Sequence, residues 1–183
     1  GVPGPESTDA EPAPVWSVDQ IRAAVAGLSD RRAVGDLEGA ARVLAEDPDV
    51  DPERIAAVGF CMGGKLALLL GCQSRRLAGV VDFYGKVRYA ELGPNWPVQP
   101  LEMTLNLSCP LLAVFGERDE SIPLADVEEL REKLAAFSKP AEIVVEPGVG
   151  HGFLNPLRST WNEAASERTW ARTRAFLDEV LTP

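Results

Sequence analysis

The sequence predicts an α/β fold in which a mostly parallel sheet carries helices on both faces. Short apolar runs predict strands at residues 55–59, 78–84, 110–115 and 143–145. Segments with apolar residues three and four positions apart predict the helices that separate and flank these strands. Short buried strands that alternate with amphipathic helices are typical of parallel sheets with crossover connections.

Each helix has its own signal in the chain. The first begins at Ser17, because Ser17 and Gln20 fit a capping box in which both side chains satisfy free backbone N–H groups. Residues 85–108 contain three prolines at positions 94, 97 and 100, which predicts a loop or lid rather than a core element. The other helices are predicted at 31–45, 63–72, 124–137 and 162–181.

The chain divides into a short leader and one domain. Residues 1–16 carry four prolines and no apolar period, which predicts a proline-rich leader or loop. Residues 17–183 are long enough for a single α/β domain with a sizeable core.

Composition and charge exclude several classes of function. A net charge of −10 disfavours nucleic acid and anionic membranes as partners. The longest apolar run, residues 66–72, is too short to span a bilayer, and no signal peptide is visible. Three cysteines and one histidine argue against a disulfide framework and a zinc site. We expect a cytoplasmic monomer or homodimer with a small-molecule substrate and without a metal or cofactor.

The segment Gly59-Phe60-Cys61-Met62-Gly63 has the form of a nucleophile elbow. In such an elbow a sharp strand-to-helix turn exposes the central side chain, and the flanking positions, here Gly59 and Gly63, must be glycine because a Cβ there would strike a neighbouring element. The start of the following helix would favour a thiolate at Cys61. A strand-turn-helix connection with a small buried cysteine is the alternative, since free cysteine is usually buried.

Two further polar residues follow predicted strands. Asp119 comes after the third strand and His151 after the fourth, and carboxyl ends of parallel strands meet at one sheet edge. The order nucleophile, acid, histidine is that of an α/β-hydrolase triad. Asp119 could instead be a solvated loop carboxylate with Glu117 as the rival acid, and His151 a surface or core residue.

These residues resemble the dienelactone hydrolase family of α/β-hydrolases, from about residue 30 to the end. Cysteine in the elbow is the most specific mark of the resemblance, because most α/β-hydrolases use serine. The matching motifs are 34–38 (Val-Gly-Asp-Leu-Glu), 59–64 with Cys61, 83–85 (Phe-Tyr-Gly), 116–119 with 122–123, and 150–153 around His151.

The resemblance implies a hydrolase of esters or lactones that acts through a thioester. It implies Cys61 as nucleophile, His151 as base and Asp119 as orienting acid, and the backbone N–H of Met62 would be one oxyanion donor. Tyr84, Phe153 and Trp96 are candidates to line the substrate pocket, with core packing as the alternative role for Phe153.

The sequence also departs from the family. Residues 1–54 lack the early strands and the second oxyanion donor of the family, so we expect an N-terminally truncated domain with weakened catalysis. Asn155 stands near the place of a substrate-binding arginine, and Arg158 is its possible substitute. The alternatives to a hydrolase are a catalytically silent protein of this fold and a thiol redox sensor.

Overall fold

The computed structural model describes residues 17–182, so the predicted leader at 1–16 lies outside the described residues. The predicted strands and helices are all present, with ends within two residues of the expected positions. Within this range no helix has the length and apolar character needed to cross a bilayer. The strands are β1 (Ile55–Phe60), β2 (Leu77–Phe83), β3 (Leu111–Gly116) and β4 (Ala141–Glu146); the helices are α1 (Val18–Gly27), α2 (Asp30–Glu46), α3 (Met62–Gln73), α4 (Pro100–Met103), the 3₁₀ turn η1 (Thr104–Asn106), α5 (Leu124–Ala136) and α6 (Glu163–Leu181).

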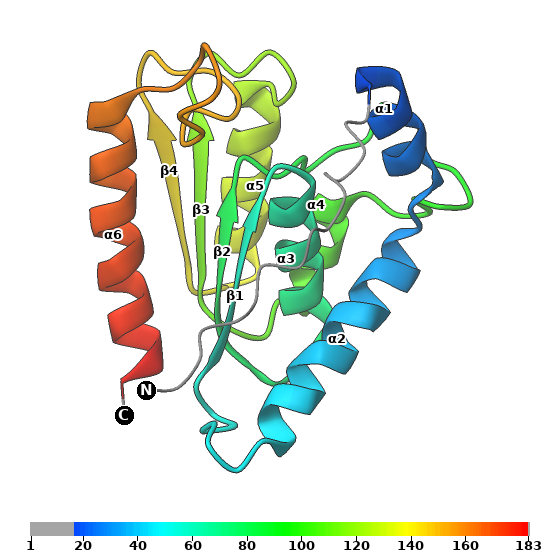
Figure 1. Ribbon diagram of the computed structural model, residues 1–183, viewed down its shortest axis with the longest axis vertical. Coiled ribbons are helices and arrows are strands. Elements are labelled where there is room, and N and C mark those ends of the chain that lie inside the picture. Colours follow the sequence, from blue (N-terminus) through cyan, green and yellow to red (C-terminus); the bar gives the residue numbers. More distant parts are fainter. Residues whose placement is uncertain (1–16, 183) are drawn as a thin grey trace, which may run out of the picture.

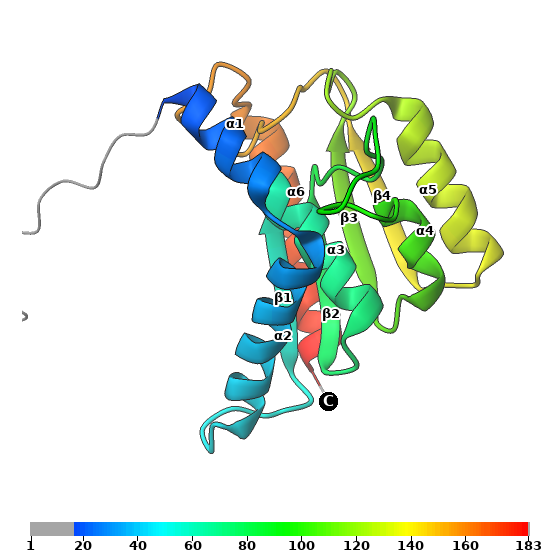
Figure 2. The same cartoon turned by 90° about the vertical axis from the view of Figure 1, so that its right-hand side faces the viewer.

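The sheet has the order β1-β2-β3-β4 and every pair is parallel, which confirms the predicted α/β class. Right-handed crossovers between strands that follow one another in this order place all connecting helices on the same face. α3 and α5 accordingly cover one face, and α6 crosses the opposite face after β4 (Figures 1 and 2). All four strands therefore end at the same edge of the sheet.

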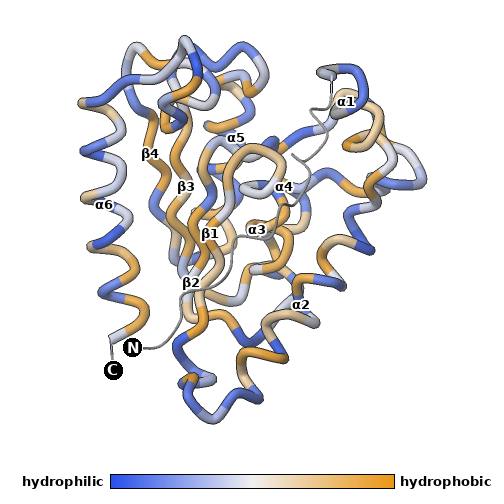
Figure 3. The backbone as a smooth tube through the Cα atoms, viewed as in Figure 1, coloured by the Kyte–Doolittle hydropathy of each residue, from blue (hydrophilic) through white to orange (hydrophobic). Residues whose placement is uncertain are grey.

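The core is continuous across the sheet, because the two central strands are buried on both faces. Every residue of β3 is buried, and Figure 3 shows apolar residues along all four strands and polar residues on the outer turns of the helices. β1 is an edge strand among the described residues, and Val58 and Phe60 are each 42% exposed there. The expectation of an N-terminal truncation stays a prediction.

The segment between β2 and β3 was predicted as a loop or lid outside the core, and that prediction is wrong in part. Most of its backbone is irregular, as expected from its prolines, but Val87, Leu101 and Leu107 are nearly or fully buried. The apolar residues of this segment have no helical or strand period, so the sequence did not indicate that they belong to the core. They are buried because α4 and η1 pack against α3.

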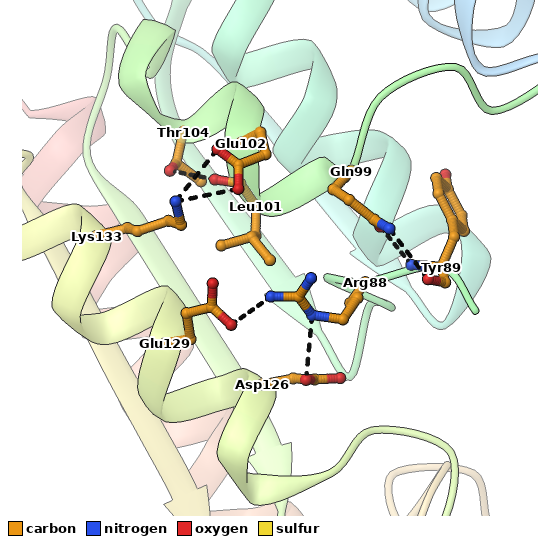
Figure 4. Close-up of polar contacts among 9 residues, drawn as sticks. All are labelled: Arg88, Tyr89, Gln99, Leu101, Glu102, Thr104, Asp126, Glu129 and Lys133. Carbon is orange, nitrogen blue, oxygen red and sulfur yellow. Dashed lines mark hydrogen bonds and ion pairs between the residues drawn. The ribbon is translucent and has the colours of Figure 1, made fainter. Parts of the chain in front are cut away.

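Polar contacts fasten this segment in place (Figure 4). The Tyr89 backbone N–H donates to Gln99 Oε1 at 2.6 Å, and Gln99 Nε2 donates to the Tyr89 carbonyl at 3.1 Å, so one amide closes the loop on itself. Three ion pairs then tie the segment to α5: Arg88 with Asp126, Arg88 with Glu129, and Glu102 with Lys133. The segment is thus a fixed wall, and this wall borders the site described below.

Two glycines inside α2 offer a test of the helix itself. Gly35 and Gly39 lie within α2, and a Cβ added to either would meet nothing within 4 Å. Because glycine loses more backbone freedom on folding than alanine, Gly35→Ala and Gly39→Ala should each raise the free energy of unfolding by about 0.5–1 kcal/mol. Urea unfolding would measure this gain, and a loss of stability in either variant would contradict the placement of α2.

Candidate active site

Cys61 occupies the sharp turn between β1 and α3. Its backbone has φ 55° and ψ −117°, in the left-handed region that non-glycine residues rarely adopt. Such strain of about 1–3 kcal/mol persists where the surroundings fix the backbone. Here the Cys61 N–H donates to the Phe83 carbonyl at 2.9 Å, which anchors the turn to the end of β2. The side chain is exposed, so the alternative of a buried cysteine does not hold.

The glycines around the turn differ from one another in their steric role. A Cβ on Gly59 would lie 2.0 Å from the Gly63 carbonyl oxygen, and a Cβ on Gly64 would lie 2.2 Å from Asp82 Oδ1. A Cβ on Gly63 would meet nothing within 4 Å, so the expectation that Gly63 must lack a side chain for steric reasons is wrong. Gly63 instead supplies the backbone against which Gly59 packs.

The three polar residues predicted to converge form one hydrogen-bonded line. Cys61 follows β1, Asp119 follows β3 and His151 follows β4, all at the carboxyl edge of the sheet. His151 Nε2 lies 3.1 Å from Cys61 Sγ, and His151 Nδ1 lies 2.7 Å from Asp119 Oδ2. The rival acid, Glu117, accepts a hydrogen bond from the Gly148 N–H at 2.7 Å instead.

The contacts among Cys61, His151 and Asp119 shift the pKa of each side chain toward its charged form. The hydrogen bond from His151 holds the pKa of Cys61 below its ordinary value, and the backbone N–H of Met62 at the sulfur acts in the same direction. The Asp119 carboxylate, followed by the Cys61 contact, raises the pKa of His151 to about 9. Burial of Asp119 opposes ionisation, but hydrogen bonds from His151 and Ser121 bring the pKa of Asp119 below its usual value. These directions favour a thiolate–imidazolium pair.

A buried carboxyl group lies under the turn. Asp82 on β2 is completely buried, accepts a hydrogen bond from the Gly85 N–H at 2.8 Å, and has its pKa raised to about 7 by that burial. Its Oδ1 occupies the space that side chains on Gly64 and Gly85 would need. Asp82 therefore fixes the turn after β2, and α3 can approach it closely because Gly64 lacks a side chain.

A cavity of about 670 Å³ opens above Cys61 and His151. Trp96 lines this cavity, whereas Tyr84 and Phe153 do not line it. Phe153 is fully buried, in agreement with the alternative of core packing. The ring of Tyr84 packs edge-on against the His151 ring, with the ring centres 5.1 Å apart. The lining residues are Val25, Cys61, Met62, Lys65, Lys86, Tyr89, Ala90, Glu91, Trp96, Ser121, Ile122, His151 and Arg158.

One wall of the cavity contains a buried ion pair. Lys65 Nζ lies 2.6 Å from Asp30 Oδ1 and 5.0 Å from the centre of the Tyr89 ring, and the Tyr89 hydroxyl donates to the other oxygen of Asp30. Trp96 stacks on Tyr89 with ring centres 5.3 Å apart. This contact set joins α2, α3 and the segment after β2 into one rigid wall.

Sequence reasoning missed several residues of the site. Lys65 is the one charged side chain in the run 62–72 of α3, a signal of a buried or functional cation, but its partner is 35 positions away and no local pattern indicates it. Asp82 interrupts an apolar strand and could have been noticed in the same way. Ser121 stands two residues after Asp119, within reach of the carboxylate, and that spacing was overlooked.

The parallel sheet, the strained turn at Cys61 and the order of the three polar residues define the α/β-hydrolase class. The model of the Dienelactone hydrolase family matches residues 16–181, which is most of the chain. The chain therefore belongs to the dienelactone hydrolase family.

Individual relatives agree with this assignment. A protein of Escherichia coli K12, provisionally named a carboxymethylenebutenolidase, is 33% identical over 148 residues, which are 81% of this chain and 54% of that protein. A Bradyrhizobium protein, provisionally named a 2-oxo-3-(5-oxofuran-2-ylidene)propanoate lactonase, is 29% identical over 161 residues, 88% of this chain and 64% of that protein. The chain thus spans about half the length of the first of these curated relatives.

A solved structure supports the fold. The crystal structure of a protein from Klebsiella pneumoniae subsp. pneumoniae MGH 78578, provisionally named a dienelactone hydrolase, superposes with a TM-score of 0.83 at 30% identity. The match covers 89% of this chain and 68% of that chain.

Proposed function

We propose that the protein hydrolyses small esters or lactones with Cys61 as nucleophile, His151 as general base and acid, and Asp119 as the group that orients His151. The observation that carries the proposal is the line of short contacts from Sγ through the imidazole to the carboxylate, set on a strained turn at the base of a cavity. Membership of the dienelactone hydrolase family supports ester or lactone bonds as the target.

The chemistry follows from the protonation that the contacts favour. The Cys61 thiolate attacks the substrate carbonyl carbon, and the developing oxyanion accepts from the Met62 N–H. Collapse of this adduct expels the alkoxide, which takes the proton from the His151 imidazolium and leaves a thioester on Cys61. His151 then removes a proton from water as the water attacks the thioester carbonyl carbon. The C–S bond breaks, which restores the Cys61 thiolate and releases the acyl group as a carboxylic acid.

The cavity lining favours substrates with a negative charge. Lys86 and Arg158 line the cavity together with a single carboxylate, Glu91, and with Lys65, whose charge is balanced by Asp30. The stacked rings of Tyr89 and Trp96 offer a flat apolar wall to the rest of the molecule. We therefore propose carboxylate-bearing esters or lactones of modest size as the substrate class.

Trapping of the acyl-enzyme tests this function. The protein is mixed with p-nitrophenyl acetate, quenched in acid, and analysed by intact and peptide mass spectrometry. We expect an acetyl group on Cys61, burst release of p-nitrophenol, and slower turnover afterwards. Rapid oxidation of Cys61 by peroxide without any acylation would favour the redox-sensor alternative. The absence of both reactions would favour a catalytically silent protein of this fold. The cytoplasmic location and the monomeric or homodimeric state stay predictions.

The pH dependence of Cys61 alkylation gives a second, independent test. Because His151 lowers the pKa of Cys61, iodoacetamide should react with a midpoint pH below that of an ordinary cysteine. Removal of the imidazole in His151→Ala should raise this midpoint toward the ordinary value, because the contact that lowers the pKa of Cys61 most is lost. Cys61→Ala supplies the background rate, and an unchanged midpoint in His151→Ala would contradict the ion pair.

A further inference from the structure

Ser121 makes three contacts with the acid and base of the site. Its backbone N–H and its hydroxyl both donate to Asp119 Oδ1, at 2.9 and 2.6 Å. Its Oγ also lies 3.2 Å from His151 Nδ1. Among the described residues 17–182, no other side chain forms hydrogen bonds with both Asp119 and His151.

The two oxygens of the Asp119 carboxylate have different partners, Ser121 and His151. Oδ1 accepts both hydrogen bonds from Ser121, which leaves Oδ2 directed at His151 Nδ1 at 2.7 Å. A carboxylate held at one oxygen by two donors cannot rotate without breaking both. Ser121 therefore sets the angle at which Asp119 meets the imidazole.

The hydroxyl also completes the surroundings of Nδ1. Since the Ser121 proton is directed at Asp119, its oxygen lone pair faces the Nδ1–H of His151. The imidazolium then has two oxygen acceptors on this side, one charged and one neutral. Loss of either weakens the hold on the charged imidazole, whose proton the Cys61 thiolate requires.

We propose that Ser121 is a positioning residue that acts on catalysis through Asp119 and His151. This role rests on the proposed function as far as turnover is concerned, but its effect on Cys61 ionisation does not. A role in shaping the turn alone is the competing explanation. The Ser121 N–H bond to Asp119 Oδ1 would survive in Ser121→Ala, so this variant separates the hydroxyl from the turn.

The experiment compares Ser121→Ala, Ser121→Thr and a matched control, Thr160→Val. The Thr160 hydroxyl donates to the His151 backbone carbonyl at 2.8 Å, so its loss removes a nearby hydroxyl that does not touch the imidazole. Two readouts are taken on each folded variant: the pH profile of iodoacetamide alkylation of Cys61, and kcat and KM for p-nitrophenyl acetate.

For Ser121→Ala we expect the alkylation rate at pH 7 to fall about threefold, because Nδ1 loses an acceptor and Asp119 is then held at Oδ1 by the Ser121 backbone N–H alone. We expect kcat to fall about tenfold with KM within about twofold, as for a group that orients a general base. Ser121→Thr should restore most of both losses, and Thr160→Val should match the wild type.

The proposal is overturned if Ser121→Ala matches Thr160→Val in the alkylation profile, or if Ser121→Thr is as impaired as Ser121→Ala. If the wild type shows no turnover at all, the proposed function fails, yet the alkylation profile still decides the role of Ser121. Should Ser121→Ala fail to fold, Ser121→Gly takes its place, since it also removes the hydroxyl and keeps the backbone donor.

Discussion

Cys61→Ala should reduce ester hydrolysis by at least about three orders of magnitude, with the fold intact. In the proposed mechanism the sulfur forms the acyl bond, and without the thioester His151 would not activate water at a comparable rate. Initial rates of p-nitrophenol release would measure the loss, and circular dichroism would show that the sheet and helices remain. The exposed position of Cys61 makes a folding defect from this change small.

Cys72→Ala is the matched control for that result. Cys72 lies at the end of α3, is buried, and does not line the cavity. Burial raises the pKa of its thiol to about 12, so it is inert as a nucleophile at neutral pH. We expect this variant to lose some stability and to keep its kcat. Activity of more than a tenth of the wild-type value in Cys61→Ala would remove the nucleophile assignment.

Gly59→Ala should destabilise the protein by about 3 kcal/mol or more, or prevent folding. The added Cβ would lie 2.0 Å from the Gly63 carbonyl oxygen, 2.3 Å from the Gly63 carbonyl carbon and 2.7 Å from the Gly64 nitrogen. All three are backbone atoms, so no side-chain rotation relieves the clash. The start of α3 would have to move away from β1, which would displace Cys61 as well. The midpoint of urea unfolding measures the loss.

Gly63→Ala provides the comparison. Gly63 is equally part of the turn motif, but its Cβ position is empty and its φ is not positive. We expect the stability of this variant within about 0.5 kcal/mol of the wild type. Equal and large destabilisation by both substitutions would show that the turn demands glycine for a reason other than the contact at Gly59.

The sequence predicted which three polar residues form the candidate site and that they meet at one edge of the sheet. Asp119 and His151 lie 58 and 90 positions from Cys61, yet each comes a few residues after an apolar run, and parallel strands must end at one edge. That rule brings the three loops together without further information. The same reasoning could not place Tyr84 and Phe153, because an aromatic residue next to a strand end can turn inward or outward, and local sequence is the same in both cases.

Side-chain contacts between elements far apart in the chain could not be predicted from the sequence for a comparable reason. Lys65 stands out in its apolar helix, but nothing in the local sequence indicates Asp30 as its partner, and their contact exists because α2 packs against α3. Packing also decided that Val87 and Leu101 belong to the core although their segment has no period. Ser121 is the exception, since its two-residue spacing from Asp119 was readable in the sequence.

The amino-acid sequence by itself predicted the α/β class, the sharp turn at Cys61 and the three residues that we propose as nucleophile, acid and base, because strand period, glycine spacing and chain order are local or topological properties. The tertiary structure alone decided which side chains line the cavity and which distant charges are paired. These depend on the distances between elements, and such distances arise from how side chains of distant segments fill the space between them.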